Sequence, residues 1–162
     1  MKDYLKTMKK LHTSFLFLSL TLLFTGCSKD DSDDNNTPAP TRLELLTSHG
    51  WRLNAFYING IDVTTTVFSP CELDNIFTYD SDYTYMIDEG PTKCNVGDPQ
   101  IIETGNWSFA NNQTMLIYEP GTPGEAEANI IQLDANNFKY EETEYDSTTM
   151  TSETYRAHFV KS

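Results

Sequence analysis

Short apolar segments separated by tight polar turns fill most of the chain after residue 50, and this spacing limits the folds available to it. Three turns are flanked on both sides by strand-forming residues: Asp80-Ser81-Asp82, Ala110-Asn111-Asn112 and Ala135-Asn136-Asn137. Aspartate and asparagine are typical of hairpin turns, because their side chains bond to nearby backbone and tolerate left-handed conformations. Short hairpins join antiparallel neighbours, whereas parallel strands need long crossovers. The sequence therefore predicts an antiparallel, all-β domain.

We expect eight or nine short strands, over residues 51–59, 63–68, 73–79, 83–87, 101–109, 114–118, 129–134, 138–144 and 149–161. The aromatic content of 12%, with nine Tyr and nine Phe, also favours sheet. Before the first strand, residues 41–49 are typical of a short helix, in which Thr41 and Glu44 form a capping box and Gly50 ends the helix. Leu43 and Leu46 would face the domain and close one end of it.

A meander of this length must hide its edge strands, either by closing into a barrel or by folding into a sandwich. Greek-key sandwiches need long crossing connections, and the clear links in this chain are tight hairpins. The longer segments around Gly60 and over residues 90–99 remain available as crossings. The pattern favours a barrel with a short N-terminal helix, and a β-sandwich is the alternative.

Residues 1–26 have the three parts of a secretory signal peptide: four lysines, an apolar run over residues 15–24, and the small residues Thr25-Gly26. A helix of that apolar run would rise only about 15 Å, which is half of a bilayer core. Small residues directly before Cys27 resemble the lipobox of bacterial lipoproteins. The resemblance implies cleavage before Cys27, a diacylglycerol on its sulfur and an acylated amino group.

Residues 27–40 contain the expected acylated cysteine and an acidic, low-complexity segment closed by prolines, which we interpret as a disordered tether. The tether begins with four residues that resemble a short export signal of Gram-negative lipoproteins: Ser28, Lys29, Asp30 and Asp31. That resemblance implies an outer-membrane lipoprotein facing the cell exterior, and a plain acidic linker is the alternative. The remaining residues, 41–162, form the predicted folded domain.

The chain is strongly acidic, with a formal net charge of −13. Residues 1–26 carry four lysines and one aspartate, a net +3, so the remaining chain carries about −16. A surface of this sign repels nucleic acid and anionic headgroups, so neither is an expected partner. We interpret the charge as a source of solubility, in preference to a cationic ligand.

Cys71 and Cys94 remain after Cys27 is assigned to the lipid, and export to an oxidising compartment predicts a disulfide between them. Closing such a loop with a disulfide stabilises the folded state by roughly 3 kcal/mol. A metal site would need further ligands, and after the leader the sequence has only His49 and His158. We therefore expect neither a metal nor a cofactor.

Several short motifs follow one another in a recognisable order: Leu46-Thr47-Ser48-His49-Gly50-Trp51, Cys71-Glu72-Leu73-Asp74, Phe77, Cys94, and Gly105-Asn106-Trp107-Ser108-Phe109. In this order they resemble the lipocalin-like domains of small bacterial lipoproteins. The resemblance extends over nearly the whole domain and implies an eight-stranded up-and-down barrel. The chain departs from the family pattern at residues 80–82, which lack the usual turn glycine.

The sequence shows no pairing of a base with a nucleophile, so we predict a protein without enzymatic activity. The run Glu141, Glu142 and Glu144 is interpreted as a solvated strand end, and Asp80-x-Asp82 as a turn, because the glycine and glutamate of a calcium loop are missing. His49 and His158 are assigned no catalytic role.

Aromatic residues at inward positions leave two hypotheses for function. They either fill the core or line a pocket for a small hydrophobic ligand, and the candidate lining is Trp51, Phe77, Trp107, Phe109, Phe138, Tyr140 and Phe159. The alternative is an interaction module with a filled core that binds glycan or protein through its outer face. Tyr79, Tyr83 and Tyr85 would then form a stacking platform for a sugar, although cross-strand pairing is the commoner use of such tyrosines.

Overall fold

The computed structural model describes residues 38–148 and 150–162. The predicted signal peptide, the acylated Cys27, the export signal at residues 28–31 and most of the tether lie outside the described residues.

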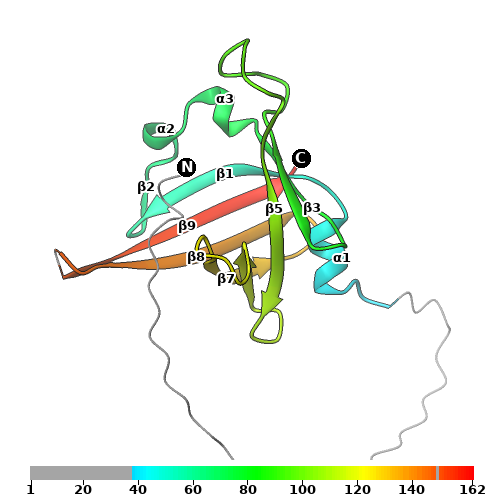
Figure 1. The fold of residues 1–162 in the computed structure, drawn as a ribbon, viewed down its shortest axis with the longest axis vertical. Coiled ribbons are helices and arrows are strands. Elements are labelled where there is room, and N and C mark those ends of the chain that lie inside the picture. Colours follow the sequence, from blue (N-terminus) through cyan, green and yellow to red (C-terminus); the bar gives the residue numbers. More distant parts are fainter. Residues whose placement is uncertain (1–37, 149) are drawn as a thin grey trace, which may run out of the picture.

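Within those two ranges the strands form one antiparallel sheet in the order β2-β1-β3-β4-β5-β6-β7-β8-β9, and an additional β1–β9 pairing closes it into a barrel (Figure 1). Short β2 only pairs back onto the last two residues of β1, so the closed barrel has eight strands in this part of the chain. The predicted up-and-down barrel is confirmed. The strands are β1 (Trp51–Ile58), β2 (Ile61–Asp62), β3 (Ile76–Tyr79), β4 (Thr84–Asp88), β5 (Ile101–Ala110), β6 (Met115–Tyr118), β7 (Ala126–Leu133), β8 (Asn137–Asp146) and β9 (Thr151–Lys161).

Strand pairing is extensive on one side of the barrel and sparse on the other. The β8–β9 register runs from Asn137↔Val160 to Asp146↔Thr151. Between β1 and β3, by contrast, the described chain pairs only Trp51↔Phe77 and Arg52↔Ile76. The segment between β2 and β3 contains two short helices, both of which contact β1 (Figure 1).

The N-terminal helix α1 (Arg42–Thr47) forms as predicted, with the Thr41 hydroxyl accepting from the Glu44 N–H and the Glu44 carboxylate accepting from the Thr41 N–H. These bonds satisfy donors that have no partner inside the helix. Leu46 is fully buried, and its carbonyl accepts a 2.9 Å hydrogen bond from the Trp51 indole N–H. The helix therefore closes one end of the barrel, as the position of its leucines predicted.

The predicted strand at residues 63–68 is wrong, because this segment contains helix α2 (Thr64–Val67). The Asp62 carboxylate accepts from both the N–H and the hydroxyl of Thr64, and the Phe56 N–H donates to the Thr64 hydroxyl at 2.8 Å. These bonds hold the chain in a turn, and they outweigh the preference of β-branched residues for strands.

The predicted strand at 73–79 is likewise shortened to β3, because helix α3 (Pro70–Leu73) comes first. Ser69 and Glu72 form a capping box, and Pro70 occupies the first helical position. A serine, a proline and a glutamate at these spacings are a helix-start signal that the hydrophobic pattern concealed.

Cys71 and Cys94 form the predicted disulfide, with their Cα atoms 5.2 Å apart. The bond ties α3 to the segment between β4 and β5. Among the described residues, no helix is both long and apolar enough to cross a membrane.

Candidate functional site

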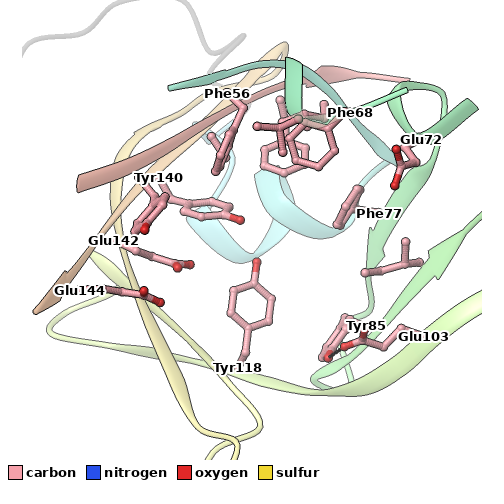
Figure 2. A pocket seen from close by; sticks show the side chains of 16 residues that line it. Phe56, Phe68, Glu72, Phe77, Tyr85, Glu103, Tyr118, Tyr140, Glu142 and Glu144 are labelled. Atoms are coloured by element: carbon pink, nitrogen blue, oxygen red, sulfur yellow. Dashed lines mark hydrogen bonds between the residues drawn. The ribbon is translucent and has the colours of Figure 1, made fainter. Parts of the chain in front are cut away.

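The barrel contains a partly open cavity of about 470 Å³, bordered by strands β1, β3, β4, β5, β6, β8 and β9, by helices α2 and α3, and by Phe68 just after α2 (Figure 2). Most of its wall is apolar or aromatic, and every polar side chain on it is a carboxylate or a phenol. The lining residues are Leu53, Phe56, Val67, Phe68, Glu72, Phe77, Tyr85, Ile87, Glu103, Tyr118, Tyr140, Glu142, Glu144, Tyr155, Ala157 and Phe159.

Of the seven aromatic residues proposed from the sequence as lining, the structure places three on the cavity wall: Phe77, Tyr140 and Phe159. Their rings contact one another through Phe159, with centroids 5.0 Å from Phe77 and 5.7 Å from Tyr140. These three side chains form a continuous aromatic surface at the inner end of the cavity.

The other four proposed residues do not line the cavity. Trp51, Trp107 and Phe138 are fully buried in the packed core, and Phe109 packs against Trp107 with ring centroids 5.1 Å apart. An eight-stranded barrel tapers around its interior side chains, so the same inward face is core at one end and cavity wall at the other. Alternation along a strand predicts which residues point inward, but it does not predict whether an inward residue lies in the packed core or on the cavity wall.

Strand β8 supplies the main polar feature of the cavity. Alternate residues of a strand share a face, so Phe138, Tyr140, Glu142 and Glu144 all point inward. Figure 2 shows the Glu142 and Glu144 side chains on the cavity wall beyond Tyr140. The interpretation of this run as a solvated strand end is therefore wrong for Glu142 and Glu144. Only Glu141 points outward, where its carboxylate pairs with Arg156 at 2.5 Å.

The two inward carboxyls of β8 are held in an environment that disfavours their charge. Burial raises the pKa of Glu142 to about 7, and the negative charge of Glu144 contributes to the same shift. The pKa of Glu144 is also raised, first by burial and then by Glu153, which lies opposite it on β9. In the described parts of the chain, neither carboxyl accepts a hydrogen bond or forms an ion pair.

Phenol groups complete the polar lining. The Tyr118 hydroxyl lies 2.5 Å from the Tyr79 hydroxyl below the cavity, and the Tyr85 hydroxyl donates to Glu103 at 2.6 Å. Burial raises the pKa of Tyr118 and of Tyr140 well above the usual value for phenols, so both stay neutral and offer a proton for hydrogen bonding.

With this geometry established, comparison with known proteins identifies the family. The sequence profile of the lipocalin-like domain matches residues 48–140, more than half of the chain. The chain belongs to the lipocalin-like domain family. A comparison with curated proteins finds no significant match.

Solved structures with a similar fold include bovine odorant-binding protein. One, the protein from bovine nasal mucosa, is 11% identical with a TM-score of 0.44, over 77% of this chain and 76% of that one. Another, a complex of the bovine protein with a selenium-containing odorant, is 10% identical with a TM-score of 0.42, over 84% of this chain and 78% of that one. At this level of similarity, the ligands of those proteins carry no information about the ligand of this lipocalin-like domain.

The tyrosines considered as a sugar platform are arranged differently in this lipocalin-like barrel. Tyr79 pairs with Tyr85 across the β3–β4 hairpin, and both are buried. The turn extends from Asp80 to Tyr83, so Tyr83 has a positive φ and lies 47% exposed beside Trp107. The three rings therefore do not share an outer face, and the platform is not formed.

Gly105 is required by the close packing around Tyr85. A Cβ at this position would lie 2.6 Å from the Tyr85 ring and 1.8 Å from a Glu119 carboxylate oxygen, both far inside contact distance. Trp107 lies two residues further along the same strand, and it is buried, as its expected inward position predicted.

The histidines lie away from the cavity lining of the lipocalin-like barrel. The His49 Nδ1 is 2.7 Å from the Ser48 hydroxyl, and its ring packs on Trp51. His158 lies in a shallow outer groove together with Lys139 and Arg156, with its Nε2 3.2 Å from the Asn137 side-chain oxygen. Among residues 38–148 and 150–162, no three His, Cys, Asp or Glu side chains are grouped to hold a metal ion.

Proposed function

We propose that the barrel binds a small, largely apolar molecule in its cavity. The observation that supports this most directly is the cavity of about 470 Å³ with its mainly apolar wall. Ligand sites in proteins are typically about 300–1,000 Å³, apolar for the most part, with a few placed polar groups. A glycan- or protein-binding module with a filled core is less well supported, because the described barrel has this cavity and lacks the tyrosine platform.

A pocket-filling substitution tests this function. Ala157 is buried and lines the cavity from β9, so Ala157→Phe would place a ring in the space that the ligand needs. We expect it to weaken binding of the neutral fluorescent probe N-phenyl-1-naphthylamine by about tenfold or more. Native mass spectrometry of protein purified from its own cells should show a retained ligand on the unaltered chain and its loss from the variant.

The matched control is Ile131→Phe, which adds a ring to an exposed position on β7. This variant should bind the probe as the unaltered protein does, and circular dichroism should show that both variants are folded. If the unaltered protein retains no small molecule and does not bind the neutral probe, the proposed function is wrong.

We also propose that the domain acts by binding, without catalysis, cofactor or metal. The cavity wall has carboxylates and phenols among the described residues, and no serine, cysteine or histidine lines it. A nucleophile paired with a base therefore has no counterpart on this wall.

For its location, we infer an outer-membrane lipoprotein that is anchored by acyl chains on Cys27 and faces the cell exterior. The lipobox-like residues before Cys27 support the anchor, and residues 28–31 support the outward address. Dual or triple acylation gives stable membrane attachment, whereas a single chain gives only marginal binding.

Replacing Cys27 by serine should release the protein from the membrane fraction, because serine has no sulfur to which the diacylglycerol can be attached. Immunoblotting of fractionated cells provides the measurement. Alanine at Lys29, Asp30 and Asp31 is the matched variant: it should remain in membranes but become protected from protease added to whole cells. A Cys27→Ser protein that still fractionates with membranes would contradict the anchor, and unchanged protease sensitivity of the alanine variant would contradict the export signal.

A further inference from the structure

The cavity wall has a single sign of charge. Among the described residues that line it are the carboxylates Glu72, Glu103, Glu142 and Glu144, and the same lining includes no lysine, arginine or histidine. Acidic side chains enter from opposite sides, with Glu142 and Glu144 on one wall and Glu72 and Glu103 on the other (Figure 2). A ligand held between these walls is surrounded by negative potential, which low-dielectric surroundings strengthen.

These carboxylates differ in how far the protein itself satisfies them. Glu103 accepts from the Tyr85 hydroxyl, and Glu72 accepts from the Ser69 backbone N–H at 2.8 Å. Glu142 has no hydrogen bond or ion pair among the described residues. Burial of a carboxylate is costly unless it is paired, so an unpaired one that faces a cavity indicates a partner that arrives from outside.

The neighbouring residue on the same strand shows what such a carboxylate does when a cation is within reach. Glu141 faces the outer surface, and its carboxylate accepts from both Nε and Nη2 of Arg156. On the inner face, the position opposite Glu142 on β9 is Tyr155, so the register supplies no cation there. The strand therefore has one carboxylate satisfied within the protein and, one residue later, another directed into the cavity without a cation.

From this arrangement we propose that the cavity selects an organic amine: a protonated amino group on an apolar body. The ammonium group would lie between Glu142 and Glu144. The apolar body would pack on the aromatic and aliphatic wall formed by Phe77, Phe159 and Leu53. Carboxylate ligands such as fatty acids would be repelled. This inference rests on the proposed binding function and specifies its ligand class.

Matched ligands that differ only in their polar end test the inference. The first series has an indole body and consists of tryptamine, tryptophol and indole-3-propionic acid, which present a cation, a neutral hydroxyl and an anion. Two further series, with a naphthyl and an octyl body and the same three polar ends, bring the number of ligands to nine. In titration calorimetry of the full-length protein above the pKa of Glu142, we expect amines to bind about tenfold or more tighter than the alcohols, and the acids weakest.

Glu142→Gln and Glu141→Gln separate the inner carboxylate from general acidity, because each removes one charge from the same strand. Glu142→Gln should reduce the preference for amine over alcohol by about tenfold. Glu141→Gln should leave both affinities unchanged. Either equal binding of amine and alcohol by the unaltered protein, or an amine preference that Glu142→Gln does not reduce, would overturn the amine assignment and leave the binding function standing. Failure of all nine ligands to bind would overturn both.

Discussion

Replacing Trp107 by alanine is expected to lower the free energy of unfolding by about 3–5 kcal/mol, the range for truncating a large buried aromatic side chain. Trp107 is 1% exposed, and its ring contacts Tyr79 and Phe109 at centroid distances of 5.7 Å and 5.1 Å. Its indole N–H donates to the Thr84 carbonyl at 2.9 Å. Truncation would leave both a void and the Thr84 carbonyl without its donor. The total free energy of unfolding of a small domain is only about 5–15 kcal/mol, so this loss is a large part of it.

Urea unfolding followed by circular dichroism measures this loss, provided that the slope of the transition is unchanged. Trp107→Phe is the matched variant, because it keeps a ring in the core and removes only the N–H and part of the volume. It should cost less, about 1–2 kcal/mol. A loss below about 1 kcal/mol for Trp107→Ala would show that the core tolerates the void, contrary to its close packing.

The overall fold is predictable from the sequence because it depends on local signals that agree with one another. The polar turns at residues 80–82, 110–112 and 135–137 joined antiparallel neighbours as expected. The capping box of Thr41 placed α1, and compartment and cysteine count gave the disulfide. Turn residues and caps act within a few positions of the chain, so they are readable without the tertiary structure.

The helices over the cavity were missed because tertiary and side-chain bonds outweighed propensity. Threonines 64–66 and Val67 favour a strand by composition, but Asp62 and Thr64 form a hydrogen-bonded turn that begins α2 instead. The hydrophobic pattern therefore did not predict the part of the cavity wall that α2 and α3 form. At the β3–β4 hairpin, the turn continues through Tyr83, which was expected to begin the next strand, and Tyr79 pairs with Tyr85.

The carboxylates of the site were missed for a different reason. Charged residues are usually solvated, and that base expectation outweighed the alternation of β8. The signal was nevertheless present: Phe138 and Tyr140 were assigned inward, and the same two-residue period continues through Glu142 and Glu144. Alternation thus identifies the face of these residues. Whether an inward position is solid core or cavity wall depends on the barrel as a whole, which no local pattern encodes.

Glu142→Gln is expected to stabilise the folded protein by about 2–3 kcal/mol at high pH and to have no such effect at low pH. The pKa of Glu142 is about 7 in the folded state, against 4.5 for an unperturbed glutamate. Below 4.5 the carboxyl is protonated in both states, so it makes no difference between them. Between the two values the unfolded chain ionises while the folded one stays protonated, which lowers the stability of the fold; above 7 the loss is complete.

Urea unfolding of the unaltered protein and the variant at about pH 4 and about pH 8.5 measures this difference, since the glutamine amide stands in for the protonated acid and cannot ionise. The charged groups near Glu142 are also negative, which agrees with a destabilising effect of its charge. Glu144 lies on the same strand, and Glu153 lies opposite Glu144 on β9. Glu141→Gln is the control, because that carboxylate is paired with Arg156 on the outer face, and it should give no stabilisation at high pH. An equal effect of Glu142→Gln at both pH values would contradict the assignment of an unpaired, buried charge.

The expected result would mean that the Glu142 carboxylate lowers the stability of the barrel without ligand. A bound cation would offset that loss of stability by supplying the missing partner.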